Sequence, residues 1–108
     1  MTISVLGAEY TVTYNHNDPR MEGMDGFCDE TTKEIVVENY EGEDGKPGVK
    51  AQLDVQRKKN VRHELVHAFL FECGLAENSP WAQNEELVDW IAIQGPKIWK
   101  AWLEAGAV

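Results

Sequence analysis

The hydrophobic spacing of the chain changes at about Gln52, from the alternation typical of strands to the three- and four-residue spacing typical of helices. Residues 3–14 are rich in Ile, Val, Tyr and Thr, and a break at Gly7-Ala8 predicts two strands joined by a turn. Another strand is expected over residues 33–37. Strands followed by helices predict an α+β fold with a small N-terminal sheet, and residues 1–108 are expected to form one domain.

Three helices are expected after the sheet. The first covers about residues 52–73, and Gly74 provides a C-terminal stop. The second begins at Ser79-Pro80, where Ser79 can cap the helix and Pro80 suits its first position, and ends at Gly95-Pro96. A short third helix is expected over residues 97–105. Its inward-facing side chains are predicted to be Ile98, Trp99 and Trp102.

The formal net charge of -9 restricts the partners of this chain. A nucleic-acid binder needs a basic face that displaces counterions from phosphates, and an anionic membrane attracts basic segments. No run of residues approaches the length of a membrane span. We therefore expect neither nucleic acid nor membrane as a partner. Residues 41–48, which are rich in acid and Gly, are predicted to form a flexible loop.

The cysteines and the N-terminus indicate the compartment. Cys28 and Cys73 do not form a CxxC pair, and we expect two half-buried thiols in a reducing environment. Residues 1–5 lack a basic segment followed by a long apolar stretch, so no signal peptide is predicted. The expected location is cytoplasmic.

His63 and His67 lie four residues apart on the first predicted helix, so both imidazoles share one face and can reach one metal ion. Neutral imidazole suits zinc, and a catalytic zinc keeps one position open for water. Glu64 lies to the side of that face, where its carboxylate could accept a proton from the water. The alternative is a chance pattern on a polar helix face.

A third protein ligand is expected from the segment Asn84-Glu85-Glu86-Leu87-Val88-Asp89. Glu85 and Asp89 are four residues apart on the second predicted helix and so face the same way. Glu86 could replace Glu85 as the ligand, but the partner Asp89 favours Glu85.

The H-E-x-x-H and N-E-x-x-x-D motifs together resemble those of the gluzincin metallopeptidases, and the size of the chain is similar to that of the minigluzincins. The resemblance covers about residues 60–90. It implies a zinc-dependent endopeptidase that acts on a peptide or protein substrate. In that family an edge strand before the active-site helix binds the substrate backbone, and residues 33–37 are the candidate here, with an ordinary packed strand as the alternative. The chain is far shorter than the large gluzincins and lacks their second subdomain.

The resemblance also implies a role for each motif residue. His63, His67 and Glu85 would bind Zn²⁺, and Glu64 would be the catalytic base. Asp89 would accept a hydrogen bond from the far ring nitrogen of His63, which fixes the tautomer of the ligand and makes it more basic.

Two other interpretations of the motifs remain open. One is a zinc-stabilised binding or regulatory domain without turnover, and the other is a metal-free structural protein. The oligomeric state is open, and no residue can be assigned as the oxyanion stabiliser. Weaker candidates for a role at the site are His16, Tyr10, Tyr14 and Tyr40.

Overall fold

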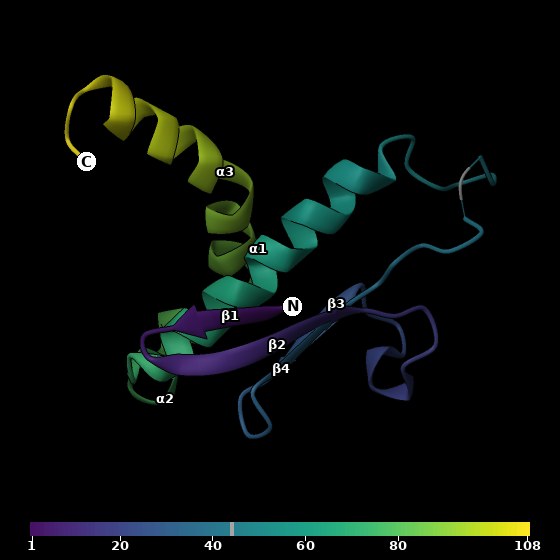
Figure 1. Cartoon of the computed structure of the whole chain (residues 1–108), viewed down its shortest axis with the longest axis horizontal. Coiled ribbons are helices and arrows are strands. Elements are labelled where there is room, and N and C mark those ends of the chain that lie inside the picture. The colour runs from purple at the N-terminus through teal and green to yellow at the C-terminus, as the bar shows by residue number, and fades with distance from the viewer. Residues whose placement is uncertain (44) are drawn as a thin grey trace.

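The computed structural model describes residues 1–43 and 45–108, so Asp44 of the predicted acidic loop lies outside the described residues. The strands are β1 (Thr2–Val5), β2 (Ala8–Tyr14), β3 (Gly26–Asp29) and β4 (Glu34–Val37). The helices are α1 (Leu53–Glu72), α2 (Leu75–Asn78) and α3 (Glu85–Glu104), with 3-10 turns η1 (Pro19–Met21) and η2 (Pro80–Gln83). The predicted α+β layout, a sheet followed by helices, is confirmed (Figure 1). Within the described residues, no helix is both long and apolar enough to cross a membrane.

The four strands form one mixed sheet in the order β1-β2-β4-β3. β2 runs parallel to β4, with Val12 opposite Ile35, and the two outer pairings are antiparallel. β4 therefore lies inside the sheet, so residues 33–37 are not the edge strand of the first interpretation, and the alternative, an ordinary packed strand, is confirmed. Ile35, Val36 and Val37 are all buried, and β4 pairs with a neighbouring strand on each side. The edge on this side of the sheet is β3.

Helix α1 lies between the sheet and the first half of α3 (Figure 1). Its buried residues recur at intervals of four or seven, which places them in one stripe along the helix. The stripe consists of Leu53, Asn60, Glu64 and Ala68. Ala68 joins the core of the sheet, whose other buried members are Val5, Tyr10, Val12, Ile35 and Val37.

The junction between α1 and α3 differs in part from the prediction. Gly74 ends α1 in the left-handed conformation, with φ of 86°, as expected. Ser79 makes no side-chain capping bond; residues 80–83 form the 3-10 turn η2 instead of the start of a long helix. Asn84 caps α3, because its Oδ1 accepts a hydrogen bond from the Leu87 backbone nitrogen at 2.8 Å. Glu85 is therefore the first residue of α3.

The predicted break at Gly95-Pro96 is wrong, because α3 continues through both residues to Glu104. Proline has no N–H to donate to the carbonyl four residues earlier, here that of Ala92. Arg62 of α1 donates from Nε to the Ala92 carbonyl oxygen at 2.6 Å and so supplies the missing partner. The ribbon of α3 changes direction along its length, as expected for a helix with an internal proline (Figure 1).

The last half of α3 extends away from the sheet (Figure 1). Trp99 and Trp102 are 53% and 50% exposed, so the expectation that they pack inward is wrong. Their rings contact each other in a T-shaped arrangement with centroids 6.4 Å apart. Ile98 is half-buried.

Candidate metal centre

Helix α1 and the first turn of α3 bring His63, His67 and Glu85 together. The Glu85 carboxylate lies between the two rings, with Oε2 2.9 Å from His63 Nε2 and Oε1 2.8 Å from His67 Nε2. One ligand atom from each of the three residues lies within 4.8 Å of the others. The three residues predicted as metal ligands are therefore neighbours in space.

The donor set fits a zinc ion. Two imidazole nitrogens and one carboxylate oxygen are a common three-ligand set for a zinc with an open fourth position. Ligand atoms around a tetrahedral zinc are about 3.3 Å apart. The observed separations of 2.8 and 2.9 Å differ from this by only a few tenths of an ångström. Burial lowers the pKa of His67, although the Glu85 carboxylate opposes that shift, and a low pKa favours the neutral imidazole that binds metal.

Asp89 orients His63, as the resemblance implies. Its Oδ1 lies 3.1 Å from Nδ1 of His63, which leaves Nε2 directed at Glu85. Lys59 Nζ donates to the same Oδ1 at 3.2 Å. Burial alone would raise the pKa of Asp89, but the hydrogen bonds from His63 and Lys59 outweigh it, so the pKa is lowered. Asp89 is therefore a carboxylate at neutral pH.

Lys59 is a part of the site that sequence reasoning misses, because a lysine near the start of a helix is ordinarily solvated. Its side chain is only 23% exposed. The available signal is its position four residues before His63, on the same face of α1.

Glu64 lies on the buried stripe of α1, where it faces the edge strand β3. The residue is only 8% exposed, and no described residue donates a hydrogen bond to its carboxylate. Burial raises the pKa of Glu64 to about 7. A Cβ at Gly26 would lie only 3.1 Å from the Val36 carbonyl oxygen and would contact Glu64 Oε2 at an ordinary 3.5 Å, so the tight contact at this glycine is with the β4 backbone.

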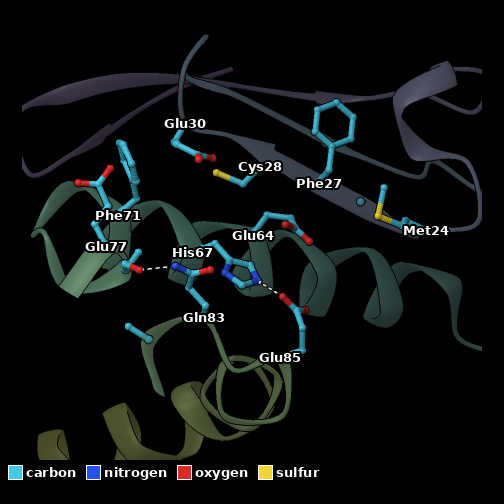
Figure 2. A pocket seen from close by; sticks show the side chains of 13 residues that line it. Met24, Phe27, Cys28, Glu30, Glu64, His67, Phe71, Glu77, Gln83 and Glu85 are labelled. Atoms are coloured by element: carbon cyan, nitrogen blue, oxygen red, sulfur yellow. Dashed lines mark hydrogen bonds and ion pairs between the residues drawn. The ribbon is translucent and has the colours of Figure 1, made fainter. Parts of the chain in front are cut away.

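A pocket of about 400 Å³ lies beside the cluster (Figure 2). Residues of β3 and its flanks form one wall, and residues of α1, α2 and η2 together with Glu85 of α3 form the other. Figure 2 shows the side chains of Glu64, His67 and Glu85 at this pocket, below Cys28 and Phe27 of β3. The buried carboxylate and two of the three candidate ligands are therefore accessible from one hollow.

The weaker candidates lie elsewhere. His16 pairs with Glu38 at 2.7 Å, and Tyr10, fully buried, donates to Glu72 at 2.7 Å. Tyr40 accepts a hydrogen bond from Asn60. Neither Tyr14 nor Glu86 lines the pocket beside the cluster. Within the described chain, the structure thus assigns none of them to the candidate metal centre.

Both cysteines are free thiols. Cys28 is half-buried, as expected, and lines the pocket. Burial raises the pKa of its thiol to about 12, with the carboxylates of Glu64 and Glu30 adding to the shift. Cys73, at the end of α1, is exposed, so the expectation of burial is wrong for that residue.

Comparison with known proteins gives no match: no protein-family model, no curated protein and no solved structure matches the chain.

Proposed function

We propose that the protein is a zinc-dependent peptidase of the gluzincin type. The observation that carries the proposal is the convergence of His63, His67 and Glu85 beside Glu64, a residue only 8% exposed whose carboxylate opens into the same pocket. A His-His-Glu cluster alone could be a set of ion pairs. A largely buried acid whose carboxylate opens into the same pocket, with a pKa raised by burial, is typical of a functional site.

The chain supplies each component that the reaction needs. His63, His67 and Glu85 would hold the zinc, with Asp89 and Lys59 fixing the ring of His63. Zinc bound there would supply Lewis acidity, which lowers the pKa of water and polarises a carbonyl group. Glu64 would take the proton of the attacking water and pass it to the leaving amine.

The edge strand β3 gives the substrate a place to bind. One side of β3 pairs with β4, and the backbone on its other side has no neighbouring strand in the described sheet. An extended peptide could add to this edge by β-augmentation, which would place its backbone along the β3 side of the pocket, across from Glu64 and His67. We therefore assign the role of the substrate-binding edge strand, which the family resemblance implies, to residues 26–29 instead of residues 33–37.

Cleavage of a diverse peptide mixture, followed by mass spectrometry, tests the proposal. We expect zinc-dependent cleavage that falls at least about 100-fold in Glu64→Gln, because the amide keeps the shape of the side chain but cannot accept the proton. Glu86→Gln is the matched control and should retain activity, since Glu86 is exposed outside the pocket. Full activity in Glu64→Gln would refute the assigned mechanism.

The second candidate function is a zinc-stabilised binding domain without turnover. It is favoured by the mutual contacts of His63, His67 and Glu85, which would suit a structural ion as well as a catalytic one. Tight zinc binding without cleavage of any peptide would support this alternative.

A further inference from the structure

The pocket beside the candidate metal centre is strongly acidic. Neither lysine nor arginine is among its lining residues, which include the four carboxylates of Glu30, Glu64, Glu77 and Glu85. A divalent ion at the cluster would balance the charges of Glu64 and Glu85. The charges of Glu30 and Glu77 would then remain uncompensated.

No cation of the described chain neutralises these two carboxylates. Neither Glu30 nor Glu77 takes part in a described ion pair. Lys33 lies 5.2 Å from the ring centre of Phe71, a lining residue, but its ammonium group pairs with Glu72 and Lys33 does not line the pocket. Glu30 is half-buried and Glu77 is exposed, so solvent screens Glu30 less.

The rest of the lining suits a long side chain with a charged end. Phe71, Ala76 and Ala82 contribute apolar surface to the same hollow, against which an aliphatic stem can pack. Figure 2 shows the Glu30 carboxylate beside Cys28, on the same wall of the pocket. Glu64 is only 8% exposed, yet its carboxylate lines this space and accepts no hydrogen bond from the described residues, so it is open to a ligand in the hollow.

We infer that this pocket selects peptides by a cationic nitrogen, which binds the carboxylate of Glu30. The inference rests on the proposed function, because it names the substrate class of the same site. The cation can belong to a lysine or arginine side chain, or to the free α-amino group of the peptide. Both sources present a protonated nitrogen, and the test distinguishes them with separate sets of peptides.

The test measures peptide binding to the catalytically inert variant Glu64→Gln, with and without added zinc. One set of short peptides, acetylated and amidated at the ends, carries a single lysine at each position in turn; a matched set carries norleucine. A third set has a free α-amino group and no lysine. Glu30→Gln is introduced into the same background, and Glu9→Gln, an exposed residue of β2 outside the pocket, is the matched control.

We expect one lysine position, or the free α-amino group, to strengthen binding about three- to tenfold over its neutral counterpart, as for a partly screened ion pair. Glu30→Gln should abolish the difference and Glu9→Gln should keep it. The preference should persist without zinc, because removing a cation leaves the pocket more negative. Equal binding of cationic and neutral peptides, or no binding of either, overturns the inference, whereas the proposed function is judged separately by zinc content and cleavage.

Discussion

Arg62 donates a hydrogen bond of 2.6 Å to the backbone carbonyl of Ala92, the carbonyl that Pro96 leaves without its helical partner. This contact joins α1 to α3, the two helices that carry the candidate ligands. It also shows how α3 continues through a proline that would otherwise leave a carbonyl unpaired between two packed helices.

Replacing Arg62 with methionine tests this compensation. We expect a loss of about 1 to 3 kcal/mol in the free energy of unfolding, because the Ala92 carbonyl loses a charged donor. In a Pro96→Ala background the new N–H at position 96 can bond to that carbonyl, so the cost of Arg62→Met should be much smaller. Urea denaturation of the natural chain, the two single variants and the double variant measures the coupling. An equal cost in both backgrounds would contradict the account.

Asp89→Asn tests the hydrogen bond that orients His63. The amide is a poorer acceptor from Nδ1, so we expect the zinc affinity to fall about 10- to 100-fold while saturating zinc still fills the site. Lys59→Met should weaken binding less, because it acts only through Asp89. Competition with a chromophoric chelator provides both affinities. An unchanged zinc affinity in Asp89→Asn would show that the contact between Asp89 and His63 does not affect how His63 binds zinc.

Gly26→Ala tests the space beside Glu64. The added methyl would lie 3.1 Å from the backbone oxygen of Val36, so we expect a loss of about 1 to 3 kcal/mol in the free energy of unfolding and a lower rate of peptide cleavage. Gly95→Ala is the control, since a methyl added there would meet no atom within 4 Å and alanine favours a helix by about 1 kcal/mol. If both substitutions stabilise the protein, the structure has room for a methyl group at position 26, and the prediction is wrong.

The pair His16–Glu38 should make stability depend on pH. The hydrogen bond and charge of Glu38 raise the pKa of His16 above 6.5, so the folded state holds this proton more tightly than the unfolded state. The stabilisation is complete below the unfolded pKa and is lost as pH rises through the folded pKa. Glu38→Gln should therefore lower the melting temperature more at about pH 5 than at about pH 9. An equal decrease at both pH values would show that the ionic part of the contact is negligible.

The parts of the site that depend on local spacing are predictable from the sequence. Residues four apart on a helix share a face, so the pairing of His63 with His67, and of Glu85 with Asp89, follows from their positions in the chain. The stop at Gly74 is equally clear from local chemistry, because glycine adopts the left-handed conformation at a helix end without a steric cost.

Features that depend on contacts between distant segments are not predictable in this way. The break expected at Pro96 does not occur because Arg62, on another helix, satisfies the freed carbonyl. The place of residues 33–37 inside the sheet follows from their pairing with both β2 and β3, and hydrophobic spacing does not specify strand order. The pocket wall formed by β3 escapes prediction for the same reason.

The zinc content of the purified protein, measured by elemental analysis, tests the central claim most directly. It should be measured for the natural chain, for Glu85→Ala, and for Glu86→Ala, which alters a neighbouring exposed acid in the same helical turn. The account predicts about one zinc per chain in the natural protein and in Glu86→Ala, and a large loss in Glu85→Ala. A natural chain that holds no zinc after zinc is supplied, or a Glu85→Ala variant that holds as much as the natural chain, would contradict it.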